Sequence, residues 1–251
     1  MEPTDVPASW GDRLHERADF ESSFNELDGF PGYTPETLRG RVRSLQMRLE
    51  EADRHFRRAA ELLAATTHRD LAQVALTDAY QREHGLLTGQ PWQRSAPTIL
   101  RLTDEKLKAI DSLRKSMDAL EALHDGRPET ALSIYRECLY TYAEAGPERQ
   151  ALWHLGIAAS EVQLDEPDEA VRHLEIAGLF VCDPLCRTLG RAQISARLAT
   201  VHAYLKDHDG AHSWWDFLTH VSCPESTRRA MRKRAALIGQ HSDELGRCVL
   251  C

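Results

Sequence analysis

Cysteine and long apolar runs are both scarce in this sequence of 251 residues. Six cysteines are too few for a secreted module built on disulfides. The longest apolar run, Ile176 to Cys182, is 7 residues long, whereas a helix needs about 20 to span a bilayer. The acidic start, Met1 to Asp5, lacks the basic and apolar regions of a secretory signal. We therefore expect a soluble, cytoplasmic chain with reduced cysteines.

Basic residues are also in deficit: 31 Lys and Arg stand against 39 Asp and Glu, which gives a net charge of −8. Neutralising phosphates requires an excess of Lys and Arg, so a nucleic-acid partner is not expected. The sequence has no phosphate-binding loop, dinucleotide-binding glycine motif, zinc-protease motif or nucleophile elbow. No convergent set of acid, base and nucleophile is visible either. These absences predict a chain that is not an enzyme and needs no cofactor.

Helix-forming residues dominate what is present. Leu, Ala, Arg and Glu carry the pattern, and no window alternates apolar with polar residues for long enough to predict a strand. We predict an all-α fold. Stretches with Gly and Pro divide it into a tail over 1–11, an N-terminal helical unit over 12–85, a linker over 86–102, a helical repeat domain over 103–240 and a C-terminal tail over 241–251.

One long helix is predicted from about residue 34 to residue 65, opened by Thr34 and Pro35. Its apolar residues alternate spacings of four and three, which is typical of a coiled-coil seam. They are Leu38, Val42, Leu45, Leu49, Ala52, Phe56, Ala59 and Leu63. Two interpretations stay open: self-association through this 38–63 seam, or packing against neighbouring helices of the same chain. Short loops favour the second, because they place neighbouring helices antiparallel.

A small–large–small pattern recurs in the second half of the chain. Each set has spacings of four and then three residues, and the first members lie 39 and 41 residues apart. The sets are Ala131, Tyr135 and Cys138; Ala170, Leu174 and Ala177; and Ala211, Trp215 and Leu218. Small residues let two antiparallel helices approach closely, and the large residue fills the space between pairs. Ala52, Phe56 and Ala59 show the same spacing, but the heptad pattern already accounts for them.

These sets resemble the tetratricopeptide repeat family over roughly residues 103–238. The best match joins Leu155–Gly156 to the set that begins at Ala170, and Ala199 to Ala211 keeps the family's spacing of 12 residues. Gly156 to Ala170 is a spacing of 14, two longer than in the family. The period near 40 also exceeds the usual period of about 34. The resemblance implies a divergent solenoid of three or four helix pairs.

Proteins that resemble this family act mostly as scaffolds or adaptors that bind a peptide or helix of a protein partner in a concave groove. The positions that the resemblance assigns to the groove are Gln150, Trp153, Ile157, Glu161, Gln193, Thr200 and Tyr204. None of them is Lys, Arg or Asn, so a clamp on a C-terminal carboxylate is not expected. The aromatic and apolar members favour a partner helix or a hydrophobic peptide. Packing of Trp153 inside the domain is the alternative.

The last four residues, Cys248 to Cys251, fit the pattern for prenylation of Cys248. A lipid alone binds membranes weakly, and basic residues upstream could supply the second signal. These residues are Arg228, Arg229, Arg232, Lys233 and Arg234. The alternative function is therefore a membrane-attached regulatory protein. An unmodified tail and a redox pair are the other interpretations of the two cysteines.

Two groups of residues could hold zinc by spacing alone. One is His208 with His212, and the other is Cys182 and Cys186 together with the two C-terminal cysteines. A glycine falls between the two histidines, which makes a shared helical face doubtful. We interpret Cys138 and Cys182 as buried small hydrophobic residues. No metal site is therefore predicted.

Overall fold

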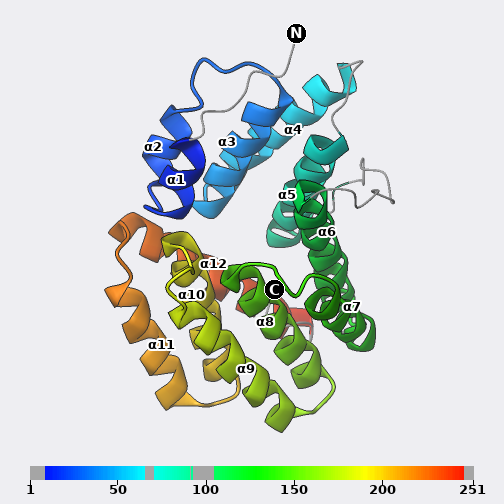
Figure 1. Ribbon diagram of the computed structural model, residues 1–251, viewed down its shortest axis with the longest axis vertical. Helices are drawn as coiled ribbons and strands as arrows, with labels where there is room; N and C mark the ends of the chain where they lie inside the picture. The colour runs from blue at the N-terminus through cyan, green and yellow to red at the C-terminus, as the bar shows by residue number, and fades with distance from the viewer. Residues whose placement is uncertain (1–8, 66–70, 91, 93–104, 246–251) are drawn as a thin grey trace. The chain divides into compact units, whose positions relative to one another are not determined.

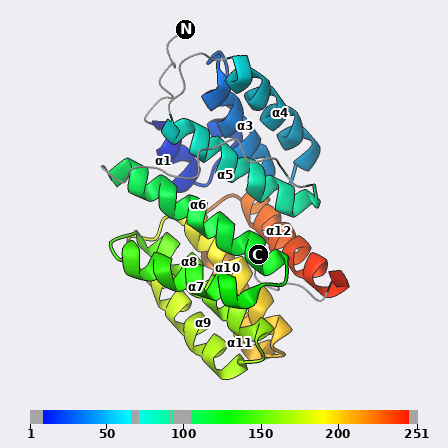
Figure 2. The same ribbon diagram turned by 90° about the vertical axis from the view of Figure 1, so that its right-hand side faces the viewer.

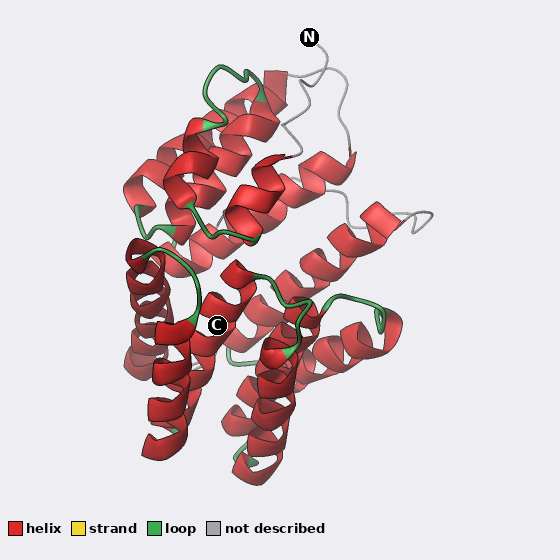
Figure 3. Ribbon diagram, turned by 60° about the vertical axis from the view of Figure 1, so that its left-hand side comes forward, coloured by secondary structure: helices red, strands yellow, loops and turns green. Residues whose placement is uncertain are grey.

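The structure is a computed structural model, and it describes residues 9–65, 71–90, 92 and 105–245. Over these residues it has twelve α-helices and no strand (Figure 3), which confirms the all-α prediction. The helices pack in neighbouring pairs. Most of the core residues within them are Leu, Ala, Val and Ile, so the core comes from side chains that also favour or tolerate helix.

The chain divides into two units, residues 1–114 and residues 115–251, and each is described by itself. The helices of the first unit are α1 (Ser9–His15), α2 (Phe20–Asn25), α3 (Tyr33–Leu45), α4 (Leu49–Ala65), α5 (Leu71–Thr88) and the first half of α6 (Glu105–His124). The second unit contains the rest of α6 and the helices α7 (Pro128–Thr141), α8 (Pro147–Gln163), α9 (Pro167–Cys182), α10 (Thr188–Tyr204), α11 (His208–His220) and α12 (Glu225–Leu245) (Figures 1 and 2).

Two helices stand where one long heptad helix was predicted. The chain turns at Met47, whose φ of 61° lies in the left-handed region, and α4 then packs against α3. Seven of the eight apolar residues of the expected seam are buried: Leu38, Val42, Leu45, Ala52, Phe56, Ala59 and Leu63. The prediction of a continuous 38–63 helix is therefore wrong, and self-association through such a helix is no longer expected.

Gly40 explains how closely α3 and α4 approach. A Cβ added at this position would lie 2.7 Å from the ring of Phe56, so the contact requires glycine. Ala52 and Ala59 flank Phe56 on α4, and all three are fully buried. The set Ala52, Phe56 and Ala59 is therefore a contact within a helix hairpin and not part of a coiled coil.

The same turn ends the first helix of four hairpins. Its centre is a residue with φ between 61° and 69°: Met47, Gly126, Asp165 and Lys206. In each turn the N–H of the next residue donates to the carbonyl five residues earlier, at 2.8–2.9 Å. This is the Schellman termination of a helix. The last three turns lie 39 and 41 residues apart, which is the period of the small–large–small sets.

Each turn fixes the register of the two helices that it joins. A buried alanine follows the left-handed residue by five positions: Ala52, Ala131, Ala170 and Ala211. A buried small residue precedes the left-handed residue by seven positions: Gly40, Ala119, Ala158 and Ala199. The two small residues are thus 12 apart in all four hairpins. The expected pairing of Gly156 with Ala170 was two residues out of register, because Ala158 is the equivalent of Gly40.

Helix boundaries differ from the predictions in three places. The first helix, α1, begins at Ser9, inside the tail predicted over 1–11. Helix α5 continues to Thr88, inside the expected linker 86–102, and most of that linker lies outside the described residues. Helix α12 continues into the expected C-terminal tail. The prenylation hypothesis falls on Cys248, which also lies outside the described residues.

Candidate functional site

Four of the predicted groove residues lie on α8, and all four are buried: Gln150, Trp153, Ile157 and Glu161. Trp153 is 1% exposed, and its Nε1–H donates to Oγ of Ser116 on α6 at 2.8 Å. Its ring packs against that of Tyr142, with the centroids 6.1 Å apart. Trp153 and Ile157 are therefore core residues of the second unit, as the alternative interpretation of Trp153 stated, and they do not line an open groove.

The error at α8 has a geometric reason. On α10, the predicted residues are more accessible: Gln193 and Thr200 are partly buried and Tyr204 is 48% exposed. Counted from the left-handed turn of each hairpin, the equivalents of these three on α8 are Leu152, Ala159 and Gln163. The α8 residues had been placed from Gly156, two positions out of register. Two residues turn a helix by about 200°, so the predicted α8 residues lie on a different face from those on α10. Ala159 is also buried, so α8 is more covered than α10 in either register.

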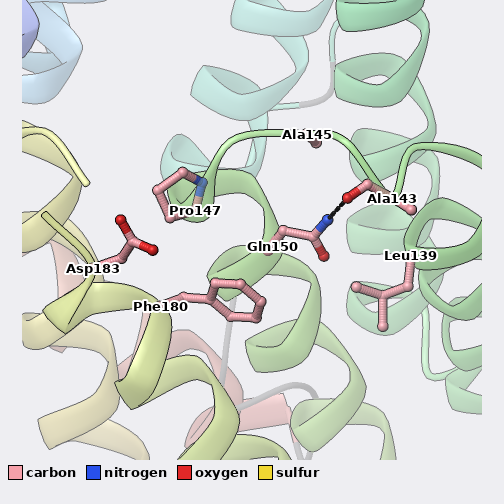
Figure 4. A pocket seen from close by; sticks show the side chains of 7 residues that line it. All are labelled: Leu139, Ala143, Ala145, Pro147, Gln150, Phe180 and Asp183. Atoms are coloured by element: carbon pink, nitrogen blue, oxygen red, sulfur yellow. Dashed lines mark hydrogen bonds between the residues drawn. The ribbon is translucent and has the colours of Figure 1, made fainter. Parts of the chain in front are cut away.

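An open hollow lies where α7 ends, α8 begins and α9 ends (Figure 4). Its volume is about 410 Å³, and it is lined by Leu139, Ala143, Ala145, Pro147, Gln150, Phe180 and Asp183. Gln150 is the predicted groove residue that the hollow contains, and its Nε2 donates to the carbonyl of Ala143 at 2.8 Å. Its lining thus combines apolar side chains with an amide and a carboxylate, as binding sites often do.

Large apolar side chains close in sequence to the lining residues are exposed. Leu179 is 73% exposed and lies one turn before Asp183 on α9, and Leu185, two residues after Asp183, is 77% exposed. Tyr140, next to the lining residue Leu139, is 89% exposed. Neighbouring apolar side chains this exposed are typical of an interaction surface. Apart from Gln150, no predicted groove residue lines this hollow. Leu179 stands outside the small–large–small set and was the available signal.

An ion pair holds the loop after α9 against the first turn of α8. Arg187 donates from Nε and Nη2 to the carboxylate of Glu148, at 2.9 and 2.6 Å, and its backbone N–H donates to the same group at 2.8 Å. Gly190 allows this approach, since a Cβ there would lie 2.5 Å from Cγ of Glu148. The pair neutralises Glu148, and among the described residues that line the hollow Asp183 alone has a charged side chain.

A polar cluster around the buried Glu161 touches the wall of the hollow. Nδ1 of His154 lies 2.8 Å from Nδ1 of His173, and Nε2 of His173 lies 3.6 Å from Oε1 of Glu161. Nη2 of Arg136 lies 3.5 Å from the same oxygen, while Oε2 of Glu161 is buried without a hydrogen-bond partner. The ring of Phe180, which lines the hollow, stacks on His154 with a centroid distance of 5.8 Å. Phe180 therefore lines the hollow and also contacts the cluster.

Burial sets the protonation of this cluster. It raises the pKa of Glu161 to about 7, with Arg136 opposing the shift and Glu169 and Glu166 adding to it. Burial, and then the neighbouring His173, lower the pKa of His154 to about 4. Burial also lowers the pKa of His173. Near pH 7 the cluster thus pairs a carboxyl close to its titration midpoint with neutral imidazoles, so it can take up or release a proton there.

We predict that Glu161→Gln changes the pH dependence of stability. Between about pH 4.5 and 7 the unfolded chain has released the Glu161 proton while the folded chain keeps it, so this residue makes stability fall as the pH rises. His154 acts oppositely between about pH 4 and 6.5, where the unfolded chain alone takes up a proton. The fall between pH 6.5 and 7.5 should therefore disappear in Glu161→Gln.

Urea unfolding at several pH values measures this effect. The exposed Glu175 on α9 offers a matched control, because Glu175→Gln removes the same charge outside the cluster and should keep the wild-type profile. Parallel profiles of wild type and Glu161→Gln from pH 6 to 8 would show that Glu161 titrates normally.

The residues considered for metal and membrane binding lie as follows. Cys138 is buried as predicted, whereas Cys182 is exposed and not buried. Within the described part of the chain, no group of three or more His, Cys, Asp or Glu is placed to hold a metal ion.

Over the same described residues, no helix is both long and apolar enough to cross a bilayer. Of the basic run, Arg234 is 2% exposed and Arg228 pairs with Glu225 at 2.8 Å, so neither is free to meet a membrane surface.

No family model, curated protein or solved structure matches this chain. The hairpins of shared register, the hollow and the polar cluster around Glu161 are thus the features from which a function has to be inferred.

Proposed function

We propose that this chain is a non-enzymatic scaffold of tetratricopeptide-like helix hairpins that binds a segment of a partner protein. The observation that supports it is the shared register of four hairpins, each with the same left-handed turn and the same 12-residue spacing of small residues. In such arrays each pair shares its core with its neighbours, and an extended surface is left for a partner. The connections at 142–146 and 183–187 help to account for a period longer than the family's.

The surroundings of the hollow favour binding over catalysis. Its polar side chains, Gln150 and Asp183, do not form a set of nucleophile, acid and base. The titratable cluster behind it is closed to a substrate, because Glu161 is 1% exposed. The exposed Leu179, Leu185 and Tyr140 offer apolar area of the kind that anchors a partner peptide or helix.

Selection of random peptides displayed on phage against the full chain tests this proposal. We expect enriched sequences whose synthetic peptides bind one-to-one, with Kd on the order of 10 µM by calorimetry. The Cys248→Ser variant should bind them equally well, because the proposed site does not involve the C-terminal cysteine. A selection that yields no saturable binder would contradict the scaffold proposal. Binding only to lipid vesicles, abolished by Cys248→Ser in protein from its native host, would favour the membrane-attached alternative.

A further inference from the structure

We infer that the hollow between α7, α8 and α9 binds a Lys or Arg side chain of the partner segment, and that apolar residues beside that side chain pack on Leu179 and Leu185. This inference rests on the proposed scaffold function and adds the chemistry of the partner. It follows from the charges, the hydrogen-bonding groups and the apolar surface at the hollow, taken in turn.

Asp183 brings a carboxylate to the lining of the hollow. Oδ1 of Asp183 accepts the backbone N–H of Leu185 at 2.8 Å, and among the described residues no cationic side chain pairs with the Asp183 carboxylate. The two nearby arginines have other partners: Arg187 binds Glu148, and Arg191 donates to the backbone carbonyl of Asp183 at 2.8 Å. A carboxylate that lines an apolar wall in this way favours a cationic ligand group.

The other polar groups at the hollow are mostly acceptors. Helices α7 and α9 both end here, and the negative end of a helix dipole favours a cation. Helix α8 begins at the hollow, and the positive end of its dipole would favour an anion instead. Its first residue is Pro147, however, which has no N–H to donate to an anion. Gln150 directs its amide N–H to Ala143 and keeps its amide oxygen as a further acceptor (Figure 4). The hollow therefore matches a donor-only cation better than an acidic group.

The apolar wall suits the rest of a basic side chain. Lys and Arg have alkyl stems that pack on apolar surfaces while the charged end reaches a polar group. Phe180 next to Asp183, and Leu139 across the hollow from it, provide such a surface (Figure 4). Leu179 and Leu185 lie on either side of Asp183 in sequence and are both more than 70% exposed, so they are available to apolar residues next to the basic one.

The phage selection described above, with the full chain as target, provides the probe. We expect the enriched peptides to contain Lys or Arg with apolar residues on at least one side. For the synthetic form of the best peptide, Asp183→Asn should weaken binding about tenfold, since a charged hydrogen bond is lost while the cap on Leu185 is kept. Leu179→Gln should weaken it several-fold, and raising the salt concentration should weaken the wild type more than Asp183→Asn.

The matched control is Asp168→Asn, which removes an exposed carboxylate at the other end of α9. It should change the affinity less than twofold, and circular dichroism should show the same helix content in all variants. Peptides without a basic residue, affinities insensitive to Asp183→Asn, or self-association of the chain through this face would each overturn the inference. If such peptides still bind one-to-one, the scaffold proposal stands without it; if no peptide binds, both fail.

Discussion

Replacing Trp153 with alanine is expected to lower the free energy of unfolding by about 3–5 kcal/mol, as for other large aromatic residues removed from a core. The side chain is 1% exposed and is among the largest fully buried ones in the described part of the chain. Its loss leaves a cavity beside Tyr142 and removes the hydrogen bond to the part-buried hydroxyl of Ser116. Urea unfolding followed by circular dichroism measures the change, and a single transition of unchanged slope would show that only stability has altered.

Three further variants separate the causes. Trp153→Phe keeps most of the volume and should cost less than the alanine variant. Ser116→Ala removes the acceptor of the Trp153 hydrogen bond and keeps the indole ring, and it should cost about 1 kcal/mol. Tyr140→Ala removes an aromatic residue that is 89% exposed and should stay within about 0.5 kcal/mol of the wild type. Wild-type stability in Trp153→Ala, with peptide binding lost, would instead restore the sequence-based assignment of Trp153 to a binding groove.

The sequence predicts the helical class and the repeat well, because the close approach of two helices leaves a local signature. Three alanines at nearly equal intervals are visible without a structure, and all three are buried where the pattern places them. The hairpin at 33–65 was misread because its spacing of four and three fits a coiled coil equally well. Its turn is centred on Met47, and the turn contains neither a glycine nor a proline, the residues that usually indicate a break. Gly40, 12 residues before Ala52, was the available signal.

The site could be predicted only in part, and the reasons differ between its components. Gln150 was named, although by way of a register that is two residues out. Phe180 and Asp183 come from another helix than Leu139, and no local pattern indicates that three separate helix ends meet at one hollow. The same is true of the half-buried pair His154 and His173, since their protonation depends on burial and burial depends on the fold.

Gly156 was paired with Ala170 in the predicted repeat, but it makes a different contact in the structure. A Cβ at Gly156 would overlap the ring of Tyr135, which lies on α7 in the preceding hairpin. Glycine was taken for the small residue of the repeat, but Ala158 fills that role, and Gly156 is matched to this one aromatic ring. At the equivalent turn register α10 carries Arg197, and the preceding hairpin there has Leu174 in place of an aromatic residue.

Gly156→Ala is therefore expected to destabilise the chain by about 2–3 kcal/mol, although alanine is the better helix former by about 1 kcal/mol. Urea unfolding measures the change, and Gly146→Ala is the matched control because no atom lies within 4 Å of a Cβ at that position. In a Tyr135→Leu background, which copies Leu174, the same substitution should cost at least 1 kcal/mol less, since the ring that it meets is gone. If the cost of Gly156→Ala is the same with and without the Tyr135 ring, the glycine is not there for that ring, and its place in the repeat has to be reconsidered.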